Sequence, residues 1–350
     1  MERIERIRKI YPFTALVGQE RMKLALIMNI INPNLGGVLI RGEKGTAKST
    51  AVRALADLMP ARSQVEGCVF SCSPDNLESI CDACYEKLSA GLKLDTTQSK
   101  MRVIDLPVSA TEDRVVGTLD IEQAIKKGEK RFEPGILAQA NKNILYVDEI
   151  NLLDDHVVDI LLDSAAMGVN FIEREGISYS HPAQFTLVGT MNPEEGDLRP
   201  QLIDRFGLVV DVYGESETEM RTEVIKRRLE FEKDSEDFVN EYAAQQNELA
   251  QRIISAMKLL PETMYEESLL EATAKISTEF AVDGHRADIV MLKTAMTIAA
   301  YEERKMATIE DLCEAAAYVL PHRMRRRPFE DSIVSMDSLV ETVREIVSML

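Results

Sequence analysis

The sequence has no apolar run long enough to cross a membrane. None of its segments approaches the ~18 consecutive apolar residues that a spanning helix requires. Residues 1–13 mix charged residues with isoleucine and contain no apolar stretch followed by a small-residue cleavage site, so they do not resemble a secretion signal. From these two absences we expect a cytoplasmic protein that does not insert into a membrane.

Basic charge and cysteine are both scarce. The 41 Lys and Arg residues face 59 Asp and Glu residues, and the net charge of −18 repels nucleic acid and anionic lipid. We therefore expect no nucleic-acid partner, and the same charge argues against a DNA motor. Five cysteines in 350 residues are too few for a disulfide framework, so in a reducing compartment they are expected to be free, redox-active or metal-bound.

The chain also lacks internal repeats and any long linker rich in Pro, Gly or Ser. It does contain enough apolar sequence to fold, because 45% of its residues are apolar and 29% are charged. At the ~150 residues typical of a domain, 350 residues fit two domains or one large domain with an appendage.

Short apolar runs alternate with helical patterns in the first part of the chain. The runs are VLIRG at 38–42, RVIDL at 102–106, NILYVDE at 143–149, FTLVGTM at 185–191 and LVVDV at 208–212. Near-continuous apolar strands separated by helices predict a parallel sheet covered on both faces. After residue 212 only helical spacing remains, with expected breaks at 283–284 and 323–328.

The first run leads into a glycine-containing loop and then a helical pattern. A strand, a tight loop and a helix N-terminus together present backbone N–H groups to phosphates, and Lys48 can reach the β and γ oxygens. Ser49 is expected to hold Mg²⁺ through its hydroxyl. Ala47 stands where a second glycine is usual; alanine is permissible there if the backbone keeps a negative φ, and Gly45 still supplies freedom in the loop. The predicted nucleotide-binding residues are Gly42, Glu43, Lys44, Gly45, Thr46, Ala47, Lys48, Ser49 and Thr50.

Polar side chains follow two later runs. Asp148 and Glu149 end an apolar strand, where the first can sit beside Mg²⁺ and the second can polarise the attacking water. Asn192 ends another run and can bond the water or the γ-phosphate, or simply serve as a turn residue before Pro193. Arg205 can stabilise a transferring phosphoryl group from the edge of a neighbouring subunit, or form a surface ion pair.

Taken together, these motifs resemble AAA+ ATPases, and more narrowly the family of magnesium chelatase I subunits. The resemblance extends over essentially the whole chain, from FTALVGQERMKLAL near the N-terminus to LPHRMRRRPFE near the C-terminus. It implies that Lys48 and Ser49 are the Walker A ligands and that Asp148 and Glu149 are the Walker B pair. It further implies that Asn192 is sensor 1, Arg205 the arginine finger, Arg286 sensor 2 and Arg199 a second candidate acting in trans.

The resemblance also implies the fold class: an α/β AAA+ P-loop NTPase with a parallel sheet, β-hairpin insertions and a C-terminal all-helical domain. We expect the α/β domain at residues 1–215, a helical linker at 216–258 and a helical lid at 259–350. The 100 residues from Lys48 to Asp148 exceed what a P-loop core needs, so insertions are expected at about 63–135. Hairpins are expected at about 107–135 and at 169–185, the latter turning at Glu175 and Gly176.

In function, the resemblance implies ATP and Mg²⁺ as cofactors and a homo-oligomeric ring, a hexamer in this family. It implies partnership with a D-type AAA+ subunit and a porphyrin-binding H-type subunit, and ATP hydrolysis that drives Mg²⁺ insertion into protoporphyrin IX. The alternative is a MoxR-type or cobaltochelatase-type ATPase that remodels a partner for metal or cofactor insertion.

Two features remain open at this stage. Four cysteines, Cys68, Cys72, Cys81 and Cys84, lie within seventeen residues and can hold Zn²⁺, form a redox pair or stay unliganded. An arginine run, Arg323 and Arg325–Arg327, can be a solvated face or a contact with an acidic partner segment. The four histidines at 156, 181, 285 and 322 show no metal-ligand spacing, and His285 is expected at most beside the nucleotide site.

Overall fold

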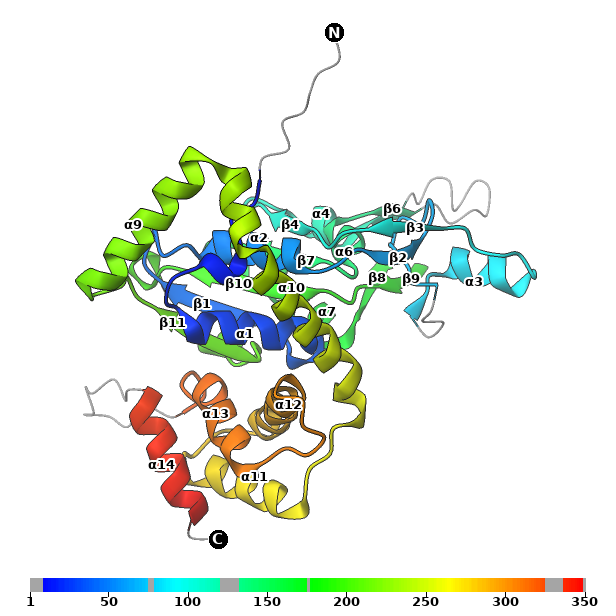
Figure 1. The fold of residues 1–350 in the computed structure, drawn as a ribbon. Helices are drawn as coiled ribbons and strands as arrows, with labels where there is room; N and C mark the ends of the chain where they lie inside the picture. Colours follow the sequence, from blue (N-terminus) through cyan, green and yellow to red (C-terminus); the bar gives the residue numbers. More distant parts are fainter. Residues whose placement is uncertain (1–8, 75–78, 120–131, 175–176, 325–335, 349–350) are drawn as a thin grey trace.

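The computed structural model describes residues 9–74, 79–119, 132–174, 177–324 and 336–348. Among them, five parallel strands form a central sheet in the order β11-β1-β10-β7-β4 (Figure 1). These strands are β1 (Val38–Gly42), β4 (Val103–Leu106), β7 (Ile144–Val147), β10 (Thr186–Met191) and β11 (Leu208–Val212). The five apolar runs therefore form the predicted parallel sheet, with strand ends that differ by at most two residues.

Helices cover both faces of this sheet, as its apolar strands require. Within β1, Val38 and Ile40 belong to the cluster that contains the apolar side chains of α1 and α2, whereas Leu39 belongs to the cluster that contains those of α7. Successive residues of a strand point to opposite faces, so each face needs its own cover. The helices of this domain are α1 (Glu20–Ile31), α2 (Lys48–Leu58), α3 (Asp82–Ser89), α4 (Glu112–Val116), α6 (Ile136–Ala140), α7 (Asp155–Met167) and α8 (Pro200–Ile203).

Three antiparallel hairpins extend from the α/β domain. They are β2 (Arg62–Val65) with β3 (Thr96–Ser99), β5 (Gly117–Leu119) with β6 (Phe132–Pro134), and β8 (Val169–Arg174) with β9 (Ile177–Pro182). Figure 1 places β2, β3, β8 and β9 together with α3 on the side of the domain away from α9. The predicted hairpin insertions are confirmed, while the turn expected at Glu175 and Gly176 and residues 120–131 lie outside the described residues.

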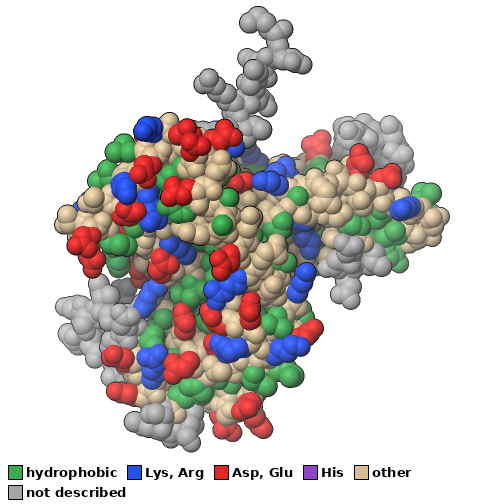
Figure 2. Space-filling view, in the orientation of Figure 1, with side chains coloured by type: hydrophobic (Ala, Val, Ile, Leu, Met, Phe, Trp, Pro, Cys, Tyr) green, Lys and Arg blue, Asp and Glu red, His purple; other side chains and the backbone are tan. Residues whose placement is uncertain are grey.

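Beyond Val212 the described regular structure is helical, as predicted. The helices are α9 (Thr218–Lys233), α10 (Ser235–Leu259), α11 (Glu267–Glu279), α12 (Arg286–Tyr301), α13 (Ile309–Val319) and α14 (Met336–Ser348). The break expected at 283–284 falls between α11 and α12, where Gly284 has a φ of 71°. None of the described helices is long and apolar enough to span a membrane. On the face drawn in Figure 2, acidic and basic side chains are interspersed.

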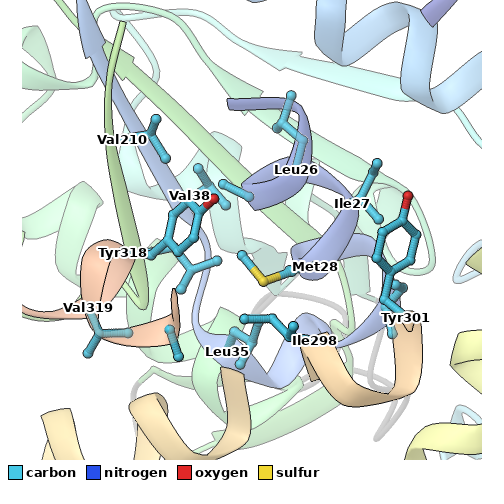
Figure 3. Close-up of a cluster of buried hydrophobic side chains, with 14 of the residues drawn as sticks. Leu26, Ile27, Met28, Leu35, Val38, Val210, Ile298, Tyr301, Tyr318 and Val319 are labelled. Atoms are coloured by element: carbon cyan, nitrogen blue, oxygen red, sulfur yellow. The ribbon is translucent and has the colours of Figure 1, made fainter. Parts of the chain in front are cut away.

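The sheet and the C-terminal helices share one apolar core. Figure 3 shows Leu35 near Ile298 of α12 and Val38 near Tyr318 of α13, and Val319 of α13 belongs to the same cluster. All five side chains are buried and belong to the same cluster, which also contains α1. The boundaries expected at residues 215 and 258 stay a prediction; α10 ends at Leu259, next to the second one.

Candidate active site

The loop that follows β1 has the form of a phosphate-binding loop. Gly42 ends the strand where any larger residue would collide, since a Cβ there would lie 2.1 Å from the Val212 carbonyl oxygen. α2 begins at Lys48, and the residue before it, Ala47, has a φ of 58° and a ψ of 21°. The condition of a negative φ at Ala47 is therefore not met: alanine here adopts the left-handed conformation that glycine adopts more easily.

Lys48 lies folded back onto this loop. Its Nζ donates to the Gly42 carbonyl oxygen at 2.5 Å and to the Glu43 carbonyl oxygen at 3.2 Å. Burial lowers the pKa of Lys48, and the nearby carboxylates of Asp148, Glu149 and Glu195 oppose that shift. The ammonium group thus stands between backbone carbonyls and acidic side chains, a position suited to a cation that binds phosphate.

The acidic pair follows β7, and β10 lies between β7 and the strand that carries the loop. Asp148 Oδ1 accepts hydrogen bonds from the Thr190 hydroxyl at 2.6 Å and from the Tyr146 hydroxyl at 3.0 Å. These bonds orient the carboxylate, and burial raises the pKa of Tyr146 so that it stays a donor. Thr190 and Tyr146 were not predicted, although Thr190 precedes Asn192 by two residues on the intervening strand.

Glu149 and Lys44 form an ion pair across the site. Glu149 has a φ of 52°, and its backbone N–H donates to the Thr190 hydroxyl at 3.3 Å. The Lys44 ammonium group lies 3.4 Å from Glu149 Oε1 and 2.5 Å from Glu195 Oε1. Its contacts with Glu195 and then with Glu149 raise the pKa of Lys44, which is an exposed side chain. The sequence did not single out Glu195, which lies in the 3-10 turn η5 (Pro193–Glu195) after β10.

Asn192 lies at the end of β10, beside the acidic pair. Its side chain is buried, and its Oδ1 accepts the Glu194 backbone N–H at 3.2 Å, so that it caps η5. The structure therefore shows the turn role and also brings the residue to the strand tip between the loop and β7. Ser49 and Thr50 occupy the first turn of α2, with Ser49 exposed.

The two arginines expected to act in trans both contact α7. Arg205 Nη1 lies 2.6 Å from Asp163 Oδ1 and 3.2 Å from Asp159 Oδ1, and Arg199 Nε lies 2.6 Å from Asp155 Oδ2. The three aspartates recur every four residues and so share one face of the helix. The structure thus brings both arginines to this acidic stripe on α7.

The C-terminal helices contribute arginines that meet at Asp204. Arg286, the first residue of α12, has Nη1 3.7 Å from Asp204 Oδ2 and is half exposed. Arg323 Nε lies 3.1 Å from Asp204 Oδ1, and the Arg323 side chain is only 1% exposed. Neither interpretation of the arginine run describes Arg323, since it is a buried residue of this chain; Arg325–Arg327 lie outside the described residues. His285 is exposed and contacts Asp288.

The fold and the site together define the class. One strand, β10, lies between β1, which leads into the phosphate-binding loop, and β7, which leads into the acidic pair. Asn192 directly follows β10, and helices follow the sheet along the chain, an arrangement that defines an AAA+ ATPase. The family model for the AAA domain (dynein-related subfamily) matches residues 84–206, and that for the AAA lid domain matches residues 270–345.

Relatives that match over almost their whole length identify the family within this class. It is 57% identical over 336 residues to the magnesium-chelatase subunit ChlI homolog of Methanocaldococcus jannaschii, which covers 96% of this chain and 91% of that protein. It is 49% identical to magnesium-chelatase subunit ChlI of Cyanophora paradoxa, with 93% of each chain covered. A structure of the complex between subunits BchI and BchD of magnesium chelatase contains a chain that is 43% identical, with 96% and 100% coverage and a TM-score of 0.55. The chain belongs to the magnesium-chelatase ChlI family.

Proposed function

We propose that this chain is the cytoplasmic ATP-hydrolysing motor subunit of a magnesium chelatase, which drives insertion of Mg²⁺ into protoporphyrin IX together with D-type and H-type subunits. The observation that supports hydrolysis most directly is the grouping of Lys48, Asp148 and Glu149 beyond the ends of β1 and β7, which are separated by the single strand β10. The names of relatives that match almost the whole chain support the chelatase assignment.

The side chains of the site suggest a division of roles. Lys48 would bind the β and γ phosphates, while Ser49 and Asp148 would hold the nucleotide's Mg²⁺, whose charge assists the departure of the phosphate. The two hydroxyl donors to Asp148 keep one carboxylate oxygen fixed. Glu149 would accept a proton from the attacking water, and Asn192 would orient that water. Lys44 must release Glu149 before Glu149 can act as a base.

We propose that the chain assembles as a ring, a hexamer as in its family, in which Arg205 reaches the site of the adjacent copy. Arg199 is a second residue placed to do so. Both now rest on the exposed acidic face of α7, where a neighbouring copy could compete for them. Arg286 would contact the γ-phosphate from the helical lid of the same copy.

Reconstitution tests the proposed function. The purified chain is mixed with D-type and H-type chelatase subunits, protoporphyrin IX, ATP and Mg²⁺, and the absorption of the metalloporphyrin is followed. We expect insertion only when all three proteins and ATP are present, and none when the chain carries Glu149→Gln. Insertion of Co²⁺ but not Mg²⁺ would favour the cobaltochelatase alternative. ATP hydrolysis without insertion of either metal would favour a MoxR-type function.

A further inference from the structure

Four cysteines that lie apart from the proposed nucleotide-binding residues bring their sulfur atoms together. The Sγ atoms of Cys68, Cys72, Cys81 and Cys84 all lie within 4.8 Å of one another, and Cys68 Sγ and Cys81 Sγ are 3.8 Å apart. Cys72, Cys81 and Cys84 are buried, and Cys68 is partly exposed. We propose that these four thiolates bind one structural Zn²⁺ ion that holds together the insertion between β2 and β3.

The spacing fits a single tetrahedral ion. A Zn–S bond of about 2.3 Å places neighbouring sulfurs of a tetrahedron about 3.8 Å apart, which is the separation of Cys68 and Cys81. A disulfide would instead require one pair at about 2.0 Å. An iron–sulfur cluster needs room for several atoms between the thiolates, and sulfurs this close leave room for one ion.

Two local structures present the ligands. Cys68 and Cys72 lie on the turn after β2, where the Ser71 N–H donates to the Cys68 carbonyl at 3.2 Å and the Val65 N–H donates to the Cys72 carbonyl at 2.9 Å. Cys81 is the N-cap of α3, and Cys84 lies in the first turn of that helix. The positive end of a helix stabilises thiolates. A rigid turn and a helix start thus supply two ligands each.

The surroundings of the sulfurs are those of a closed site. Cys72, Cys81 and Cys84 belong to a small buried cluster with Val65, Phe70, Leu94 and Ala138. The Cys81 backbone N–H donates to Cys72 Sγ at 3.2 Å, a bond that offsets negative charge on the sulfur. Four protein ligands in a buried setting leave no open coordination position, so the metal is structural rather than catalytic.

The cluster is joined to the other hairpins and to the base of β7. The Phe70 ring stacks on His181 of β9 with centroids 4.8 Å apart and faces Phe132 of β6 at 6.2 Å. The Phe70 carbonyl accepts from Asn141 Nδ2 at 2.6 Å, and Asn141 Oδ1 accepts the Gln184 N–H at 2.8 Å. Asn141 lies three residues before Ile144, the first residue of β7. Its hydrogen bond to the Phe70 carbonyl therefore connects the segment that carries the cysteines to the start of that strand.

Metal analysis of the full chain, purified under reducing conditions without added metal, tests the proposal. We expect about one Zn per chain. A mercurial reagent that reacts with thiols should release this zinc as four thiols are titrated, and a chromogenic zinc chelator detects the released ion. Replacement by Co²⁺ should give the visible absorption of a tetrahedral tetrathiolate site. These measurements use the unaltered protein and do not depend on a variant that folds.

Variants locate the site. The double variant Cys81→Ser, Cys84→Ser should lose the zinc. The matched control is Cys313→Ser, which changes a buried cysteine of α13 outside the cluster and should keep the zinc. The proposal is overturned by protein that contains no zinc and has five freely titratable thiols, by a disulfide within the cluster in place of metal, or by iron as the bound metal. Zinc retained by the double variant would overturn it as well. None of these outcomes bears on ATP hydrolysis, so this proposal and the proposed function fail separately.

Discussion

The guanidinium group of Arg323 donates hydrogen bonds to both the side chain and the backbone carbonyl of Asp204. Arg323 Nε donates to Asp204 Oδ1 at 3.1 Å, and Nη2 donates to the Asp204 carbonyl at 2.8 Å. The same group donates to the Phe206 carbonyl at 2.5 Å and to the Gly207 carbonyl at 3.2 Å. Since Arg323 follows α13 and Asp204 directly precedes Arg205, the C-terminal helices hold the segment that carries the proposed arginine finger.

Arg323→Ala should strongly destabilise the fold. Removing the guanidinium group takes its donors from the Phe206 and Gly207 carbonyls and should cost about 2 kcal/mol or more, whereas the Asp204 side chain is 43% exposed and can still be solvated. The matched control is Arg344→Ala, which breaks an exposed pair with Glu310 and should leave stability nearly unchanged. Urea unfolding followed by circular dichroism measures both. Equal losses for the two variants would contradict the role assigned to Arg323.

His322 should make stability depend on pH. Its Nε2 lies 3.2 Å from the Phe206 carbonyl, and its Nδ1 is buried with no hydrogen-bond partner. Burial, and then the charges of Arg323 and Arg41, hold the pKa of His322 well below its usual value of 6.5. The folded form therefore stays neutral while the unfolded form takes up a proton, and stability falls as the pH drops below about 6.5.

The His322 contribution to this loss approaches about 1.4 kcal/mol per pH unit below the unfolded pKa. His322→Gln should remove that part of the slope between pH 7 and 5.5, whereas His285→Gln, at a side chain 92% exposed, should leave it unchanged. Unfolding free energies at several pH values provide the measurement. An unaltered slope in His322→Gln would show that other groups cause it.

Ala47→Gly should stabilise the protein or leave its stability unchanged. At a φ of 58°, alanine carries a steric cost of about 1 kcal/mol that glycine does not. The same substitution at Ala244, exposed within α10, should instead destabilise by about 1 kcal/mol, because glycine is a poor helix residue. Thermal or urea unfolding of the two variants compares the signs directly. A similar loss in both would mean that Ala47 is not strained.

Lys48→Ala and Glu149→Gln should separate binding from hydrolysis. The first removes the ammonium group proposed to bind phosphate and should abolish nucleotide binding. The second preserves shape but removes the base, so it should bind ATP with Mg²⁺ and not turn over. A fluorescent ATP analogue reports binding, and phosphate release reports turnover. Lys305→Ala, which changes an exposed pair with Glu262, is the control and should do both normally.

Arg205→Ala should bind ATP but hydrolyse it slower by on the order of 10³ to 10⁵ if the residue serves the neighbouring copy. Mixed with Lys48→Ala, itself inactive, it should regain partial activity, because some interfaces then join an intact Lys48 to an intact Arg205. Mixing Lys48→Ala with the Lys48→Ala, Arg205→Ala double variant gives the matched control, in which no intact site can form. Co-assembly without any rescue would place both residues in the same copy's site.

The sheet and its nucleotide loop could be predicted because both are local in sequence. Each strand of the sheet is a nearly continuous apolar run, and the loop from Gly42 to Lys48 is a single segment. The excess length between Lys48 and Asp148 predicted insertions, and the family resemblance implied that they form hairpins. These features do not depend on which distant segments meet.

The features that the sequence did not predict depend on contacts between residues that are far apart in the sequence. Thr190 reaches Asp148 only because β10 is inserted between β1 and β7, and Glu195 reaches Lys44 only after the chain turns beyond that strand. Arg323 lies in a run of arginines, a pattern typical of solvated surface, yet it is buried because the carbonyls before β11 supply its acceptors. The φ of Ala47 is set by the loop and cannot be inferred from the side chain.

The apolar core shared by the sheet domain and the C-terminal helices limits how the molecule can move. α1 lies between the two regions, and its buried side chains contact both in one continuous cluster. A swing of the lid alone would expose that surface at about 25 cal/mol for each Å² of apolar area uncovered. A displacement that begins at Arg286 must therefore carry α1 and β1 with it. Opening a hinge between α12 and the sheet would uncover this shared core, so we expect the C-terminal helices and the sheet to move as one body.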